Sequence, residues 1–248
     1  ASRLWSVDKI MTTVIGICGQ MGAGKDTVAD YLVDTLNYKK IALADPFKEF
    51  AKHVFNFSDE QLWGESNERN KVDHRCETPA YWATSLYRFS THKEKFIKTL
   101  RNGEDEAALE SLTSWMLTMH DECKKSLTPR KILQELGTEW GQSIEKTIWV
   151  NAALHAIDKD PHTKFVISDV RFKHEIERLV DYGGQLIRLA RDTDSTETHI
   201  SEKEILTIKP EFFSATITNN KDKQSLYNTL DIVVPALEKA SHASYRIH

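Results

Sequence analysis

The apolar positions of this chain follow two alternating patterns. Short runs rich in apolar and β-branched residues predict strands at 14–18, 41–44, 165–168, 186–189 and 215–219. Between these runs, apolar residues recur every three or four positions, which is typical of helices that cover a core. Strands that alternate with helices favour a parallel sheet with right-handed crossover connections. The pattern therefore predicts an α/β fold with a doubly wound parallel sheet.

The ends of several predicted helices carry local signals. We expect the first helix to end at Asn37 and the next to begin at Asp45-Pro46, with Asp45 as its cap. Thr128-Pro129 repeats this signal of a capping residue followed by proline. The pair Gly183-Gly184 closes a further helix, and 225–239 is expected to form the last one.

The middle of the chain, 57–127, departs from this regular alternation. Residues 65–75 are densely charged and either form a solvated loop or offer Arg69, Lys71 and Arg75 to an anionic substrate. Residues 76–92 carry aromatic residues without clear spacing, which we expect to pack against a neighbouring helix rather than stack on a base. A helix is clear at 104–125, and its apolar face is expected to be core or a subunit contact. That face consists of Ala108, Leu112, Trp115, Met116 and Met119. We predict a core of 11–56 and 128–240, with 57–127 as a mainly helical insertion that forms the substrate site or a lid.

Composition adds limits on size, compartment and partners. The 248 residues suffice for one large domain, or for a core domain with a smaller appendage. A net charge of −4 argues against direct nucleic-acid binding, and no apolar run approaches the roughly 20 residues that span a membrane.

The three cysteines lack metal-ligand spacing, which favours a reducing, cytoplasmic setting. Residues 1–10 show no secretory pattern, and Met11 begins the run that leads into the first strand. We therefore expect Met11 to be the native start and 1–10 an expression remnant.

The stretch Gly19–Thr27 carries the clearest chemistry. It reads G-Q-M-G-A-G-K-D-T and lies between the first predicted strand and the first predicted helix. In that context a G-x-x-x-x-G-K pattern forms a loop whose backbone N–H groups bind phosphate oxygens at the helix N-terminus. The loop predicts a nucleoside triphosphate site, with Lys25 at the β- and γ-phosphates.

One position departs from the usual form of this loop. Asp26 stands where Ser or Thr normally binds Mg²⁺, and Thr27 follows with a hydroxyl. A carboxylate repels phosphate, so we expect Asp26 to face a cation or Mg²⁺-bound water. Asp26 and Thr27 are therefore the candidate metal ligands, either of them through water.

Polar residues at the ends of other predicted strands indicate the reaction. In a parallel sheet, strand ends gather at one crevice, so Asp45, Asp169, Arg171 and Arg191 are expected to converge near Lys25. Phosphoryl transfer requires such charge neutralisation and alignment of the acceptor. The guanine-binding motif N-K-x-D is absent, since 220–223 read N-K-D-K. These features favour a small-molecule kinase over a switch GTPase.

Six blocks in fixed order resemble bacteriophage deoxynucleoside monophosphate kinases. They are Gly19–Thr27, Leu43–Lys48, Arg130–Thr138, Trp149-Val150, Asp169–Glu175 and Thr198–Ile200. The phosphate loop of that family also contains the sequence G-K-D-T, so Asp26 matches the family pattern. The resemblance implies a P-loop kinase fold, ATP and Mg²⁺ as cofactors, a 2′-deoxynucleoside monophosphate as substrate, and a homodimer that supplies DNA precursors.

The resemblance also implies roles for individual residues. Those at ATP are Gly22, Ala23, Gly24, Lys25, Asp26, Thr27 and Arg191. Those at the substrate are Ala44, Pro46, Lys48, Arg69, Arg130, Gln134, Gly137, Thr138, Trp149, Asp169, Val170, Arg171 and Glu175. The resemblance assigns catalytic roles to Lys25, Arg130, Asp169 and Arg171.

Several alternatives stay open on the sequence alone. Trp149 is either a core residue or a base contact, and Thr138 either bonds a base or caps a helix break. His199 is either a nucleotide contact or a solvated side chain. Another P-loop kinase, of the dephospho-coenzyme A or phosphomevalonate type, is the nearest alternative function. A nucleotide-dependent regulator or nucleic-acid-binding ATPase is the alternative from a different class, although the acidic balance lacks the basic stripe it requires.

Overall fold

The structure, a computed structural model, describes residues 12–20, 22–191 and 207–243. The chain forms two compact units. The first combines the chain before Leu43 with the chain after Ala152, and the second is Leu43–Ala152. The block Thr198–Ile200, including His199, and the segment 1–10 lie outside the described residues.

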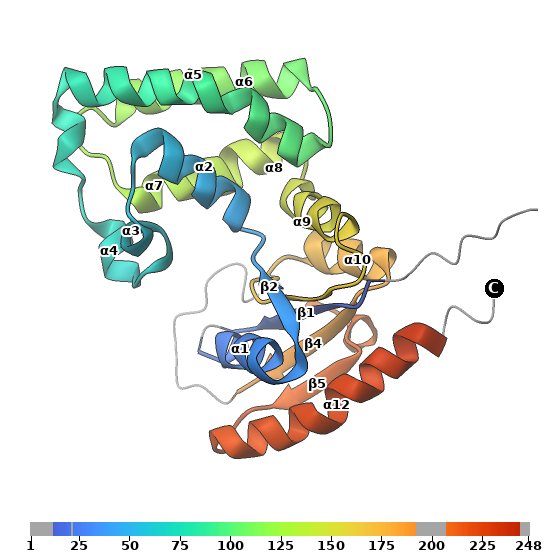
Figure 1. Cartoon of the computed structure of the whole chain (residues 1–248). Coiled ribbons are helices and arrows are strands. Elements are labelled where there is room, and N and C mark those ends of the chain that lie inside the picture. The colour runs from blue at the N-terminus through green and yellow to red at the C-terminus, as the bar shows by residue number, and fades with distance from the viewer. Residues whose placement is uncertain (1–11, 21, 192–206, 244–248) are drawn as a thin grey trace, which may run out of the picture. The chain divides into compact units, whose positions relative to one another are not determined.

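Within the described residues, the first unit contains a five-stranded parallel sheet (Figure 1). The strands are β1 Val14–Gly19, β2 Tyr38–Ile41, β3 Lys164–Ile167, β4 Gln185–Ala190 and β5 Ala215–Thr218. Their spatial order is β2-β3-β1-β4-β5, so β1 lies at the centre, with β3 and the edge strand β2 on one side and β4 and β5 on the other. The carboxyl end of β1 is thus the point where the strand order reverses, which is where ligands bind in such sheets.

Helices cover both faces of this sheet, which confirms the doubly wound α/β class. They include α1 Lys25–Leu36, α10 Lys173–Tyr182 and α12 Lys223–Ala243. Ile17 of β1 belongs to the same buried core as Leu32 of α1 and Leu230 of α12. On the other face, a Cβ at Gly16 would lie 3.2 Å from Leu179 of α10. Burial of each large aliphatic side chain contributes about 1.5–3 kcal/mol.

The predicted second strand was misplaced by three residues. The run 41–44 was expected to be the strand, but β2 is Tyr38–Ile41 and Leu43 lies buried beyond its end. The reason is that β2 is the edge strand, where only part of the strand is buried and two lysines are tolerated on it. The cap of the following helix also shifts by one residue, because Asp45 is its first helical residue and Ala44 precedes it.

The second unit consists of helices and helical turns in the described residues. They are α2 Asp45–Phe55, α3 Asp59–Trp63, α4 Ser66–Asn70, η1 His74–Glu77, α5 Pro79–Arg101, α6 Glu106–Glu122, α7 Pro129–Gln134, η2 Glu135–Trp140 and α8 Gly141–Ile144. Helix α9, Ile148–Asp158, begins in this unit. The side chain of Thr128 accepts a hydrogen bond from Lys131 N and Pro129 occupies the first turn of α7, as predicted.

The helical unit is wider than the predicted insertion 57–127 at both ends, since 43–56 and 128–152, predicted as core, belong to it. At the first end the reason is that α2 packs into the unit. Phe50 of α2 stacks on Phe96 of α5, with ring centroids 4.1 Å apart. Phe55 of α2 meets Trp115 of α6 edge to face at 6.3 Å. Aromatic pairs of this kind stabilise by about 0.5–1.5 kcal/mol beyond their buried area. These contacts make the segment before Phe57 part of the same hydrophobic core.

The first half of helix α5 showed no clear helical spacing in the sequence. Its buried side includes Trp82, Ser85 and Phe89, while Tyr87 between them is 70% exposed. A polar residue at a buried position and an exposed aromatic residue obscure the helical spacing. The apolar face of α6 is buried within the chain, with Trp115 at 8% its most exposed member. That face is therefore core and is not available as a subunit contact.

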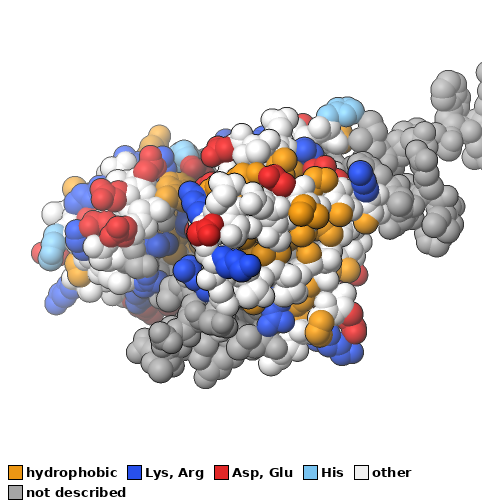
Figure 2. Space-filling view, turned by 90° about the horizontal axis from the view of Figure 1, so that it is seen from below, with side chains coloured by type: hydrophobic (Ala, Val, Ile, Leu, Met, Phe, Trp, Pro, Cys, Tyr) orange, Lys and Arg blue, Asp and Glu red, His pale blue; other side chains and the backbone are white. Residues whose placement is uncertain are grey.

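The distribution of surface charge agrees with the small net charge of −4. Figure 2 shows acidic and basic side chains interspersed on the visible face. Among the described helices, none has both the length and the apolar character needed to cross a bilayer. Cys18, Cys76 and Cys123 are buried free thiols, and Cys18 lies inside β1 as predicted.

Candidate functional site

The phosphate loop joins the carboxyl end of β1 to the start of α1. Gly22 and Gly24 have φ values of 77° and 99°, in the left-handed region that glycine adopts without strain. Gly24 is the N-cap of α1, and its carbonyl accepts the first helical hydrogen bond from Val28 N at 3.0 Å. The positive end of the helix dipole therefore lies at this loop.

Side-chain donors hold four carbonyl groups of the loop. Lys25 Nζ donates to Gly19 O at 2.7 Å and to Gln20 O at 2.8 Å. Two further donors come from residues that follow other strands of the sheet. Arg191, after β4, donates to Gly22 O at 3.3 Å, and Asn219, after β5, donates to Ala23 O at 2.9 Å.

The held carbonyls determine where the loop's N–H groups point. In a trans peptide the C=O and the following N–H point in opposite directions. Turning the carbonyls of Gly22 and Ala23 toward Arg191 and Asn219 therefore turns the next N–H groups away from these donors. Successive N–H groups at a helix N-terminus form an anion-binding concavity, so this loop fits the phosphates of ATP. Arg191, predicted on the ATP side, does contact the loop.

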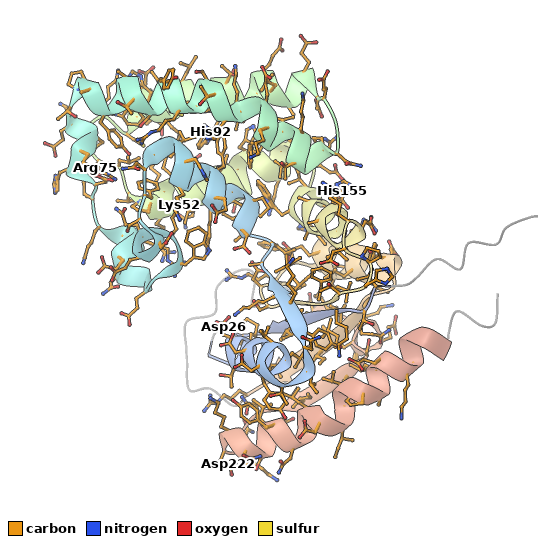
Figure 3. The ribbon with its side chains drawn as sticks, viewed as in Figure 1. Asp26, Lys52, Arg75, His92, His155 and Asp222 are labelled. Atoms are coloured by element: carbon orange, nitrogen blue, oxygen red, sulfur yellow. The ribbon has the colours of Figure 1, made fainter. Side chains whose placement is uncertain are left out.

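Asp26 is paired with a lysine from the neighbouring edge strand. Lys40 Nζ lies 3.2 Å from Asp26 Oδ1 and 3.1 Å from Asp30 Oδ1, one helical turn further along α1. Figure 3 shows Asp26 on α1. Burial opposes the charged form of Lys40, but hydrogen bonds and attraction from Asp30 and Asp26 outweigh it and raise the pKa of Lys40. The cation that Asp26 was expected to face is thus present in the protein itself.

The donor set around the loop fits Mg²⁺ held partly by phosphates. Mg²⁺ at such sites uses one or two protein oxygens and completes its shell with water and substrate phosphates. Thr27 supplies a hydroxyl in the first turn of α1, and Asp169 follows β3, the strand beside β1. Among the described residues, no group of three or more His, Cys, Asp or Glu side chains could hold a metal ion.

A buried carboxylate shapes the turn after β3. Glu175 is 7% exposed, and its Oε2 accepts backbone hydrogen bonds from Arg171 N at 2.8 Å and Phe172 N at 3.0 Å. Burial raises the pKa of Glu175 to about 7, because these two hydrogen bonds offset only part of the desolvation. Glu175 was expected beside the substrate, but its carboxyl instead anchors the turn that carries Asp169 and Arg171.

The other predicted residues of this turn differ in exposure. The side chain of Arg171 is exposed and Asp169 is half-buried. Val170 is fully buried, and a Cβ at Gly16 would lie 3.4 Å from its Cγ2. The side chain of Val170 therefore belongs to the sheet core, so a substrate contact by it is restricted to its backbone.

Three predicted cationic residues lie on neighbouring helices of the second unit. Lys48 is on α2, Arg69 on α4 and Arg130 on α7, and all three are half-buried. Arg130 Nε donates to Asn70 Oδ1 at 2.5 Å, which ties α7 to α4. Lys48 Nζ lies 5.7 Å from the ring centroid of Trp63, a residue the sequence did not single out. Guanidinium and ammonium groups on adjacent helices suit an anionic ligand.

The predicted base-contact region divides into a buried and an exposed part. Trp149 is 5% exposed and donates through Nε1 to Gly137 O at 2.7 Å. It meets Phe47 edge to face at 4.8 Å, which supports the alternative that it is a core residue. Gly137 is buried in the π-helical turn η2, whereas Gln134 and Thr138 are exposed. Ala44 and Pro46 lie half-buried at the start of α2.

The predicted site residues thus fall in both units. Those around ATP belong to the first unit, together with Asp169, Val170, Arg171 and Glu175. Asp45 and the remaining predicted substrate residues belong to the second unit. The convergence of Asp45 with Lys25 remains a prediction.

Lys40 and Asn219 were missed because no motif contains them. A polar residue directly after the last strand was the available signal for Asn219.

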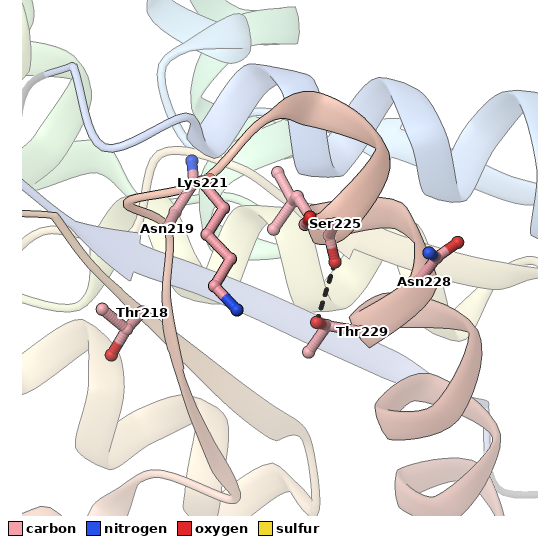
Figure 4. A pocket seen from close by; sticks show the side chains of 7 residues that line it. Thr218, Asn219, Lys221, Ser225, Asn228 and Thr229 are labelled. Carbon is pink, nitrogen blue, oxygen red and sulfur yellow. Dashed lines mark hydrogen bonds between the residues drawn. The ribbon is translucent and has the colours of Figure 1, made fainter.

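A polar cavity of about 280 Å³ adjoins Asn219 (Figure 4). It lies between the end of β5 and the first turns of α12. Its lining is Thr218, Asn219, Lys221, Ser225, Leu226, Asn228 and Thr229. The hydroxyl of Thr229 donates to Ser225 O at 2.9 Å along the helix.

Comparison with known proteins supports a kinase. The sequence profile of the family described as "Deoxynucleotide monophosphate kinase" matches residues 13–230. A protein of Acanthamoeba polyphaga mimivirus, provisionally named a deoxynucleotide monophosphate kinase, is 28% identical over 230 residues, covering 88% of this chain and 93% of its own length. The deoxynucleoside-5′-monophosphate kinase of Escherichia phage T5 is 28% identical over 193 residues, covering 68% of this chain and 72% of its own.

Among solved structures, an unliganded sugar kinase from Janibacter sp. HTCC2649 aligns with a TM-score of 0.35 and 13% identity. The alignment covers 91% of this chain and 98% of that protein. A likeness this distant carries no argument about substrate.

Proposed function

The chain belongs to the deoxynucleotide monophosphate kinase family, and from this membership we propose how it works. It transfers the γ-phosphoryl group of ATP to the phosphate of a 2′-deoxynucleoside 5′-monophosphate and yields the diphosphate for DNA precursor synthesis. The observation that carries this function is the family match over 13–230, which includes the phosphate loop and the Arg130 and Asp169–Glu175 blocks.

The donor side of the reaction is assigned to the first unit. The loop from Gly22 to Thr27 binds the ATP phosphates through backbone N–H groups, and the ammonium of Lys25 neutralises the β- and γ-phosphates. Lys25 donates to loop carbonyls at 2.7 and 2.8 Å, so its ammonium already lies at the loop. Arg191 adds a second cation beside Gly22.

The acceptor side is assigned to the second unit. Lys48, Arg69 and Arg130 supply positive charge for the monophosphate, and Arg130 is oriented by Asn70. The exposed Gln134 and Thr138 are the groups available to hydrogen-bond the nucleoside. Trp149 and Gly137 act indirectly, as the packed wall behind these residues, since both are buried.

The chemistry needs alignment and charge neutralisation more than covalent catalysis. A phosphate oxygen of the acceptor attacks the γ-phosphorus and ADP leaves, without a covalent enzyme intermediate. Asp169 orients the acceptor from the end of β3, while Arg171 and Lys25 share the charge of the transferring group. Bound Mg²⁺ would neutralise phosphate charge, held by Thr27 and, through water, by Asp26.

A coupled assay of ADP release tests this function. It uses all four deoxynucleoside monophosphates, their ribonucleotide counterparts, dephospho-coenzyme A, phosphomevalonate and DNA as acceptors. Turnover with deoxynucleoside monophosphates supports the proposal, and the ribonucleotides show how strictly the 2′ position is discriminated. Turnover restricted to dephospho-coenzyme A, to phosphomevalonate or to DNA would overturn it.

The assembly and location of the enzyme are also part of the proposal. By resemblance to its family, it acts as a homodimer in the cytoplasm, without direct contact to nucleic acid. Since the apolar face of α6 is buried, the dimer contact must lie on another surface. Light scattering of the purified chain, with twice the mass of 28.5 kDa expected, tests the dimer.

A further inference from the structure

The side chain of Asn219 connects the last strand to the phosphate loop. Its amide Nδ2 donates to Ala23 O at 2.9 Å, across 196 positions of sequence. Its own backbone N donates to Ala190 O at 2.7 Å, which fixes Asn219 beside the end of β4. The amide therefore projects from a backbone held by the sheet onto the residue pair that precedes Lys25.

The contact acts on one particular peptide unit. Ala23 O and Gly24 N–H belong to the same planar peptide, and they point in opposite directions. A donor that captures Ala23 O on one side therefore turns Gly24 N–H to the other side, where the loop binds anions. Ala23 is fully buried, and its own N donates to Gln20 O at 3.2 Å, so the preceding Gly22–Ala23 peptide is held as well.

The space next to Gly24 shows how closely the amide is packed. Gly24 has a φ of 99°, and a Cβ built there would lie 2.7 Å from Asn219 Nδ2. The absent side chain of Gly24 leaves the room that the amide occupies. Glycine at this position thus serves both the left-handed backbone and the approach of Asn219.

We propose that Asn219 is a positioning residue for ATP binding, because its amide holds the Ala23–Gly24 peptide with the N–H turned toward the phosphates. The inference rests on the proposed function, since it concerns the same phosphate loop. It assigns to Asn219 an effect on every ligand that carries the polyphosphate group, whatever its base or sugar.

Titration calorimetry with inorganic tripolyphosphate and with ATP tests this role, in buffer with Mg²⁺ and without acceptor. In Asn219→Ala, loss of one hydrogen bond that orients the loop should raise the Kd of both ligands by about tenfold. The two factors should agree within twofold. In steady-state assays KM for ATP should rise about tenfold, while KM for the deoxynucleoside monophosphate changes less than twofold.

Asn228→Ala is the matched control. Asn228 lines the same cavity but its side chain bonds to Gln224 at 3.0 Å on α12. This variant should keep the tripolyphosphate affinity of the unmodified chain within twofold. Asn219→Asp is the second variant, since it keeps the shape of the side chain while removing the donor. It should lose at least as much affinity as Asn219→Ala.

Two results would overturn the inference. One is tripolyphosphate affinity within twofold of the unmodified chain in both Asn219 variants with unchanged circular dichroism. The other is loss of ATP affinity with normal tripolyphosphate affinity, which would place Asn219 at the nucleoside instead. Lack of turnover by the unmodified chain, with the tripolyphosphate effect intact, would refute the proposed function and leave this inference standing.

Discussion

Lys40 Nζ lies 3.2 Å from Asp26 Oδ1, so the residue that distinguishes this phosphate loop from the common form is paired with a lysine of the edge strand β2. The pairing places a positive charge next to a carboxylate that would otherwise repel phosphate. It also explains how Asp is tolerated where Ser or Thr is usual.

Lys40→Met is expected to raise KM for ATP by about two- to fivefold, the range of an exposed ion pair. Without Lys40, the Asp26 charge acts on the phosphates directly. Lys39→Met is the control, because it removes the same charge from the same strand. Lys39 Nζ lies 3.9 Å from Asp160 Oδ2, and its side chain is 63% exposed. Steady-state kinetics at low and high salt measure the effect, and a KM for ATP equal to that of Lys39→Met would contradict it.

Lys25→Ala is expected to lower kcat by at least about 10²–10³, by analogy with removal of one transition-state donor. The ammonium is lost from the loop, while the half-buried position leaves the sheet core intact. The coupled assay measures turnover and circular dichroism checks the fold. Near-normal turnover by a folded Lys25→Ala protein would refute the assignment of this loop.

Arg130→Met is expected to lower kcat/KM for the deoxynucleoside monophosphate by about 10- to 100-fold, since a charge-assisted contact is worth about 1.5–3 kcal/mol. KM for ATP should change little. Lys131→Met is the matched control from the same helix, where Lys131 Nζ bonds Glu122 at 2.8 Å instead. Equal losses in the two variants would show that general charge, not Arg130, governs acceptor binding.

Glu175 is expected to make stability depend on pH. Its pKa rises from 4.5 to about 7 on folding, so the folded state favours the protonated carboxyl. This contribution to the free energy of unfolding is fully present below about pH 4.5 and is lost as the pH rises through about 7. Glu175→Gln cannot ionise and should flatten the pH dependence in that window.

Denaturant unfolding between pH 4 and 8 measures the effect of Glu175. Glu177→Gln is the control, because Glu177 lies on the same helix with its carboxyl 3.4 Å from Lys173 at the surface. A pH dependence in Glu175→Gln as steep as that of Glu177→Gln would exclude Glu175 as its source.

Gly137→Ala is expected to destabilise the chain by about 1–3 kcal/mol through overpacking. The new Cβ would lie 2.9 Å from Phe47 Cζ inside the π-helical turn. Denaturant unfolding measures the loss, and Gly103→Ala should stay within about 0.5 kcal/mol because a Cβ there meets open space. Phe47→Leu should recover part of the loss, and no destabilisation by Gly137→Ala would contradict this packing.

The sequence correctly predicted those features of the fold that depend only on residues close together in the chain. The glycines and Lys25 of the phosphate loop, the Thr128-Pro129 start of α7 and the alternation of strands with helices depend on neighbouring residues, and the structure contains all of them. Patterns failed at β2 and α5. There the edge position of Tyr38–Ile41 and the buried Ser85 departed from the expected hydrophobic spacing.

The sequence by itself determined the α/β class, the phosphate loop and the resemblance to a kinase family. Tertiary structure alone decided the strand order β2-β3-β1-β4-β5 and the partners of the loop. Asn219 reaches Ala23 across 196 positions, and Lys40 reaches Asp26 only because β2 packs beside α1. The physical reason is that a side chain's partner depends on which strand ends the sheet brings together, and local propensity carries no record of that arrangement.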